Sequence, residues 1–92
     1  MEAPKIETTE KGFLVIPINL QQNLHVKGMC ICDSCNSASF DTMYYLPVLA
    51  GRTYCKECYD EWHQDATYYK EDTGYEKSNA QSFLKQFNKA VQ

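Results

Sequence analysis

The chain has 92 residues, a formal net charge of −3 and 43% hydrophobic residues. Its length implies one domain, and its hydrophobic content excludes a wholly disordered chain. The negative charge disfavours general affinity for nucleic acid, which depends on neutralising phosphates. No apolar run approaches the roughly 20 residues of a membrane-spanning helix, and the charged start does not resemble a secretory leader. We therefore expect no membrane partner and a cytoplasmic location.

The first third of the chain predicts one strand. Residues 1–11 are polar and are expected to form a flexible N-terminal segment, followed by a single domain over residues 12–92. Within that domain, residues 12–29 are assigned to a strand and a connector. The apolar, β-branched run at residues 13–18 predicts the strand, and Pro17 places it at a sheet edge or near its last residue. Residues 21–29 are expected to lead as a connector into the first cysteines.

A hairpin and a helix follow, within a core assigned to residues 30–69. Residues 43–49 and 52–54 predict the two arms of the hairpin, and Gly51 supplies the positive φ of a tight turn. Pro47 favours an edge strand for the first arm. A helix is expected to begin at the second cysteine pair and end before Gly74. One face would carry residues at three- and four-residue steps, namely Cys55, Cys58, Trp62, Ala66 and Tyr69.

The end of the chain predicts a connector over residues 70–77 and a helix over residues 78–92. Ser78 and Gln81 have the spacing of a capping box. Phe83, Leu84 and Phe87 form an apolar stripe that would pack on the domain or on a partner, including another copy.

Four of the five cysteines have the spacing of a metal site. Cys32 and Cys35 are separated by two residues, as are Cys55 and Cys58, and 19 residues lie between the pairs. This spacing is typical of structural zinc sites in proteins of a reducing compartment. Two intervening residues let a tight turn direct both sulfur atoms at one ion, and the hairpin returns the second pair. We therefore predict one structural Zn²⁺, in a small zinc-stabilised α+β domain.

Alternatives to zinc stay open at this stage. Two disulfides would need an oxidising compartment and would leave one cysteine over. A thioredoxin-like redox pair needs a βαβ setting that the sequence does not predict. Iron can occupy the same four thiolates as zinc, and the sequence does not choose between the two metals.

The segment Cys32–Cys35, here called the knuckle, is followed by a hairpin and by a helix carrying the second cysteine pair. This order resembles a treble-clef zinc finger. The phrase "YYLPVLAGRTYCKECYDEW" is similar to small uncharacterised zinc proteins of bacteria, phages and mobile elements. The resemblance implies a treble-clef core and ligand roles for Cys32, Cys35, Cys55 and Cys58. It implies no particular function, because this fold serves many.

The other candidate ligands have simpler interpretations. Cys30 could be an alternative ligand or a redox-sensitive thiol, but we interpret it as a small buried side chain on a strand that enters the knuckle. His25 and His63 are expected to face solvent or to form hydrogen bonds, because four well-spaced thiols already complete a zinc site.

Six further side chains are candidates for partner contact. One of Tyr44 and Tyr45 should face outward, because adjacent residues of a strand point to opposite sides. The complete set of candidate contacts is Tyr44, Tyr45, Arg52, Lys56, Phe83 and Phe87.

Three functions are compatible with these features. We expect a non-catalytic protein-interaction module, an adaptor or small inhibitor that binds another protein or itself. The alternative is a nucleic-acid-binding or transcription-associated finger that uses Arg52, Lys56 and the C-terminal lysines. An enzyme or redox protein is the least expected of the three, because the sequence shows no acid–base pair and four thiolates leave zinc no open coordination position.

Overall fold

The computed structural model describes residues 3–27 and 30–91, which form an α+β domain. Four antiparallel strands lie in the order β1-β2-β3-β4. No helix in this described part of the chain is long and apolar enough to cross a bilayer. The strands are β1 (Glu7–Thr8), β2 (Leu14–Ile18), β3 (Met43–Leu46) and β4 (Arg52–Tyr54); the helices are α1 (Leu20–Lys27), α2 (Lys56–Asp65) and α3 (Thr73–Val91), with 3-10 turns η1 (Pro47–Leu49) and η2 (Lys70–Asp72).

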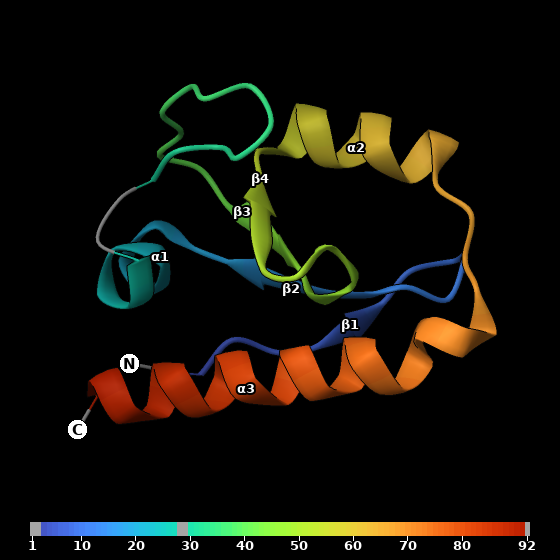
Figure 1. Cartoon of the computed structure of the whole chain (residues 1–92). Coiled ribbons are helices and arrows are strands. Elements are labelled where there is room, and N and C mark those ends of the chain that lie inside the picture. The colour runs from blue at the N-terminus through green and yellow to red at the C-terminus, as the bar shows by residue number, and fades with distance from the viewer. Residues whose placement is uncertain (1–2, 28–29, 92) are drawn as a thin grey trace.

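The sheet is covered on both faces, as Figure 1 shows, with α3 on one side and α2 on the other. Neighbouring residues of β3 point to these opposite sides. The ring of Tyr45 lies 4.1 Å from that of Phe83 in α3, whereas the ring of Tyr44 stacks 4.5 Å from that of Tyr59 in α2. Both helices therefore pack on the central strands through aromatic side chains.

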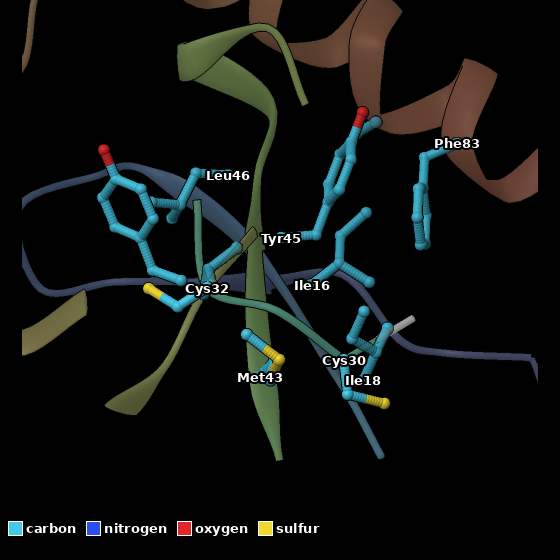
Figure 2. Close-up of a cluster of buried hydrophobic side chains, with 11 residues drawn as sticks. Ile16, Ile18, Cys30, Cys32, Met43, Tyr45, Leu46 and Phe83 are labelled. Atoms are coloured by element: carbon cyan, nitrogen blue, oxygen red, sulfur yellow. The ribbon is translucent and has the colours of Figure 1, made fainter. Parts of the chain in front are cut away.

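The core lies between the sheet and its covering elements (Figure 2). Ile16, Ile18, Met43 and Leu46 are almost completely buried, and Phe83 joins them from α3. At about 25 cal/mol for each Å² of apolar surface removed from water, such side chains supply most of the driving force for folding. The knuckle also enters this core, because Cys30 and Cys32 are both buried in the same cluster.

A helix occupies part of the segment that we predicted to be a connector. α1 begins after Asn19, whose side-chain oxygen accepts a hydrogen bond from the Gln22 backbone at 2.8 Å. In return, the Gln22 side chain accepts a bond from the Asn19 backbone at 2.9 Å. This reciprocal pair is a capping box that satisfies two free donors at the helix start. The connector prediction was wrong because we overlooked that signal.

The N-terminal segment also differs from expectation. Residues 7–8 were predicted to be flexible, but they form β1 and pair with Val15 and Leu14 of β2.

Pro17 and Pro47 were predicted to mark a sheet edge or, for Pro17, the end of its strand, but Pro47 does not lie in an edge strand. It begins η1 directly after β3, a central strand paired on both sides. Pro17 is the last residue but one of β2, as one of our two alternatives required.

The C-terminal helix begins five residues earlier than the capping-box spacing at Ser78 predicted. α3 starts at Thr73, so Ser78 and Gln81 lie within the helix and are exposed. α2 ends at Asp65, before Gly74 as expected. Tyr69 therefore lies beyond α2 and is 58% exposed, so its predicted place on the helix face was wrong.

Candidate metal centre

The structure brings together the four cysteines whose spacing predicted a metal site. The sulfur atoms of Cys32, Cys35, Cys55 and Cys58 all lie within 4.8 Å of one another. Cys32 and Cys35 lie on the turn that is closed by the isolated bridge between Ile31 and Ala38. Cys55 is the residue before α2, and Cys58 is in the first turn of that helix. Two segments remote in sequence therefore contribute one pair each.

The spacing of these sulfur atoms fits a tetrahedral metal ion. A Zn–S bond of about 2.3 Å implies sulfur–sulfur separations of about 3.8 Å in a regular tetrahedron. The Cys35 and Cys55 sulfur atoms are 4.0 Å apart. A slight contraction of the group would bring all four thiolates to bonding distance of one ion. The four-thiolate donor set suits Zn²⁺ and also iron.

The buried thiol is supported by the backbone. The Cys32 sulfur accepts hydrogen bonds from the Ser34 N–H at 3.4 Å and from the Cys55 N–H at 3.3 Å. These donors would stabilise negative charge on the sulfur. One of them comes from each half of the site, so the same bonds also join the two halves.

The turn itself is held by backbone hydrogen bonds. The Asn36 N–H donates to the Cys32 carbonyl at 2.9 Å, and the Cys32 N–H donates to the Ser37 carbonyl at 3.0 Å. Asn36 adopts a left-handed φ of 60°, which asparagine tolerates better than most residues. The conformation of the knuckle is therefore stabilised by backbone hydrogen bonds within residues 32–37.

Asp33 attaches this turn to the sheet. The Asp33 N–H donates to the Thr53 carbonyl at 2.9 Å. The Thr53 N–H donates to the Asp33 carboxylate at 2.8 Å. These two bonds fix the first cysteine pair beside β4, from which the chain continues directly to the second pair. Sequence reasoning missed this role, although an acidic side chain inside a cysteine knuckle is a possible signal for it.

Proton binding by the thiols shows why the group favours a cation. Hydrogen bonds with the backbone and side chain of Ser37 lower the pKa of the Cys35 thiol to about 7. A hydrogen bond with Ser34 favours the Cys58 thiolate, but the Cys55 thiol beside it and burial outweigh this effect, so the pKa of Cys58 rises to about 12. Four neighbouring thiols cannot all ionise cheaply without a positive ion. A bound metal would displace the remaining protons.

The remaining cysteine and the two histidines lie outside this group. Cys30 is 8% exposed, in agreement with the interpretation of a small buried side chain, and Figure 2 shows its sulfur pointing away from that of Cys32. The ring of His25 packs near that of Phe87, with 5.8 Å between centroids. The Nε2 atom of His63 is buried and has no hydrogen-bond partner in the described part of the chain, contrary to our expectation.

Three of the six predicted contact residues are buried. Tyr45 is 8% exposed, Phe83 2% and Phe87 1%. They pack inside the domain and therefore offer almost no surface to a partner. The apolar stripe of α3 packs on its own domain, as one of our two alternatives required: Phe83 lies against Tyr45 of β3 and Phe87 against His25 of α1.

The other three are accessible at least in part. Arg52 is exposed and Tyr44 is half-buried against Tyr59. Lys56 is exposed and bonds Asp60 at 3.0 Å, with its ammonium group 5.5 Å from the centre of the Tyr44 ring. Phe40 was not predicted as a contact, yet it is 74% exposed in the loop between the knuckle and β3. A single phenylalanine among polar residues carries no periodic signal that could have marked it.

Comparison with protein-family models, with curated proteins and with solved structures gives no match for this chain. The function must therefore be argued from the site and the surface alone.

Proposed function

We propose that this chain is a zinc-stabilised, non-catalytic protein-interaction module with a treble-clef core. The grouping of four cysteine thiols carries the first part of the proposal. The order of knuckle, β3–β4 hairpin and α2 supports the treble-clef assignment. Four protein ligands would fill the coordination sphere of zinc, so the ion would hold the fold together and leave no position for a substrate.

The surface beside the knuckle supports the interaction role. Phe40 is 74% exposed and Ile31 43% exposed, and they flank the first cysteine pair in the sequence. Large exposed aromatic side chains are enriched where proteins bind each other. The exposed residues of α2 include Glu57, Asp60 and Glu61, which would favour a partner with basic groups. An adaptor or a small inhibitor would use such a surface.

The metal part of this proposal is tested by metal analysis and unfolding. We expect one zinc ion per purified chain, and loss of far-UV and near-UV circular dichroism when a strong chelator removes it, because metal binding and folding are coupled. Substituting any of the four ligands with serine should have the same effect, whereas Cys30→Ser should retain zinc. A chain that stays folded without metal would contradict the proposal.

The interaction part is tested by affinity capture on the zinc-loaded chain, with Phe40→Ser as the matched control. Phe40 is exposed, so this variant should keep the melting temperature within a few degrees. We expect a defined protein to be recovered after nuclease treatment by the unaltered chain and lost with the variant. Recovery of nucleic acid, released by added salt, would instead support a nucleic-acid-binding finger.

A further inference from the structure

The four thiols differ strongly in their access to solvent. Cys32 is completely buried, Cys55 and Cys58 are half-buried, and Cys35 is exposed. Cys35 and Cys55 also line an open groove of about 320 Å³ beside the site. A reagent arriving from solvent therefore meets Cys35 before the other three. Cys32, in contrast, is part of the buried core cluster, and its sulfur accepts hydrogen bonds from two backbone N–H groups.

The groove has a distinct chemical character. Its wall combines the serines Ser37 and Ser39 with the carboxylates of Asp41 and Glu57. Lys56 is the cation that lines it, and its charge is already shared with Asp60 at 3.0 Å. With the thiolates of Cys35 and Cys55 also in its lining, the groove would repel anions and admit small neutral molecules.

From this geometry we propose that Cys35 is a modification site, the ligand at which a small neutral oxidant of the peroxide class opens the metal centre. The inference rests on the proposed metal site. It assigns a reactive role to one ligand of that site.

Oxidation of Cys35 by peroxide can lead to a disulfide, because a second thiol, that of Cys55, already lies nearby. The Cys35 thiolate attacks one oxygen of hydrogen peroxide, the O–O bond breaks, hydroxide leaves and a sulfenic acid forms. The Cys55 thiolate, whose sulfur lies 4.0 Å from that of Cys35, then attacks the oxidised sulfur. A second hydroxide leaves and a Cys35–Cys55 disulfide closes. The two sulfur atoms give up two electrons and one peroxide is reduced to two hydroxides, so a bound ion would be left with Cys32 and Cys58.

The test is peptide mapping of the zinc-loaded, full-length chain during slow oxidation by hydrogen peroxide. A chromogenic zinc indicator follows release in the same samples. We expect the first oxidised residue to be Cys35, the first disulfide to be Cys35–Cys55, and zinc release to share their rate constant. First oxidation at Cys32, Cys58 or Cys30, or zinc release before any change at Cys35, would overturn the inference.

Two matched reagents test the role of the groove. Iodoacetamide and iodoacetate have nearly the same size, but only iodoacetate is an anion. Relative to a short cysteine peptide, Cys35 should favour iodoacetamide over iodoacetate by on the order of tenfold at low salt. Equal relative rates would show that the groove does not select neutral reagents and would overturn that part of the inference.

A ligand-retaining variant separates reactivity from folding. Cys35→His keeps a zinc ligand, so the variant should bind one ion, and peroxide should release it at least about tenfold more slowly if thiolate oxidation starts at this position. Cys30→Ser is the control and should leave the release rate unchanged. An unchanged rate in a zinc-loaded Cys35→His chain would overturn the inference. If the unaltered chain contains no zinc, the proposed metal site fails; if it contains zinc that is lost through another cysteine, only this inference fails.

Discussion

At the scale of single residues, two side chains outside the four cysteines attach neighbouring elements to the sheet. Asp33 ties the knuckle to β4 through Thr53. Glu76, which is 1% exposed, ties α3 to β2 by accepting a hydrogen bond from the Leu14 N–H at 2.8 Å. Neither residue would contact the ion. Each one bonds a backbone group that has no other strand beside it.

Removing the Asp33 carboxylate should weaken the attachment of the knuckle. We expect Asp33→Ala to lower the free energy of unfolding by about 1 to 2 kcal/mol, because the Thr53 N–H loses a charged acceptor. Asp33→Asn keeps an oxygen at that place and should lose less. Chemical denaturation at one fixed free-zinc concentration measures both variants. A loss in Asp33→Asn equal to that in Asp33→Ala would argue against the hydrogen bond as the cause.

Glu76 should introduce a pH dependence. Burial raises the pKa of its carboxyl above the ordinary value of 4.5, the Leu14 N–H opposes the shift, and Asp72 adds to it. Because folding favours the protonated form, the stabilising contribution is complete below the ordinary pKa and is lost as the pH rises through the folded pKa. The Leu14 amide resonance should therefore titrate with a midpoint above 4.5.

Two variants check that assignment. Asp72→Asn should lower the midpoint, because it removes a neighbouring negative charge. Glu76→Gln should abolish the titration of the Leu14 amide while preserving its hydrogen bond. A titration that persists in Glu76→Gln would come from another group, such as the cysteine ligands as they release metal.

At the scale of elements, α1 and α2 are each held at one end by side-chain hydrogen bonds that the hydrophobic pattern does not reveal. The C-terminal end of α2 is held by Lys11, whose ammonium group donates to the carbonyls of His63, Gln64 and Ala66. A cation suits this end of a helix, where carbonyls lack partners and the dipole is negative. The N-terminal end of α1 is held by Asn19 and Gln22.

Lys11→Met should loosen the end of α2. Three carbonyls would lose a charged donor from a residue more than 50 positions away. We expect faster hydrogen exchange in the last turn of α2 and a loss of about 1 kcal/mol in stability. The control is Lys85→Met, which changes an exposed lysine of α3 and should alter neither quantity. Unchanged exchange in Lys11→Met would show that the cap contributes nothing in solution.

The two capping-box spacings provide a matched pair of substitutions. Asn19→Ala removes an observed cap and should cost about 1 kcal/mol. Ser78→Ala changes an exposed position inside α3, where alanine has the higher helix propensity, so it should be neutral or slightly stabilising. Thermal unfolding of both variants decides the question. An equal loss in the two would contradict the helix boundaries described above.

This comparison shows where sequence reasoning succeeds and where it stops. The spacing of the four cysteines identified the group, and the alternation of Tyr44 and Tyr45 correctly placed them on opposite sides of the sheet, because both depend on local geometry. The expectation that one of them faces outward was not met, since Tyr44 stacks on Tyr59. The same four-residue capping pattern was accepted at Ser78 and overlooked at Asn19. The N-terminal part of α3 is tied to β2 by the hydrogen bond between Glu76 and the Leu14 N–H, and these residues are 62 positions apart in the sequence. The bonds of Asp33 and Lys11 join residues remote in sequence, so no local pattern predicts them.

At the scale of the whole molecule, the cysteine group and the apolar core are continuous. Cys32 belongs to the core cluster, and Cys55 and Cys58 pack against it, so the group joins the knuckle and the start of α2 to that core. A chain of 92 residues buries a limited core, so a metal staple can decide whether it folds.

Stability should therefore depend on free zinc in a quantitative way. If one ion binds the folded chain and not the unfolded one, each tenfold rise in free zinc above the dissociation constant adds about 1.4 kcal/mol to the free energy of unfolding. Denaturation in a series of metal buffers measures this slope. A slope near zero would separate the ion from folding, and a doubled slope would indicate two ions.

The bonds between Asp33 and Thr53 have a consequence for assembly of the chain with itself. β4 is the last strand of the sheet, and its outward N–H and C=O groups at Thr53 are occupied by the knuckle. Once the knuckle opens, those groups become a free strand edge, flanked by the aromatic ring of Tyr54. Such an edge can template pairing with a strand of another molecule. Loss of a bound ion would then expose an edge that can pair, so we expect metal removal to promote association between copies of the chain.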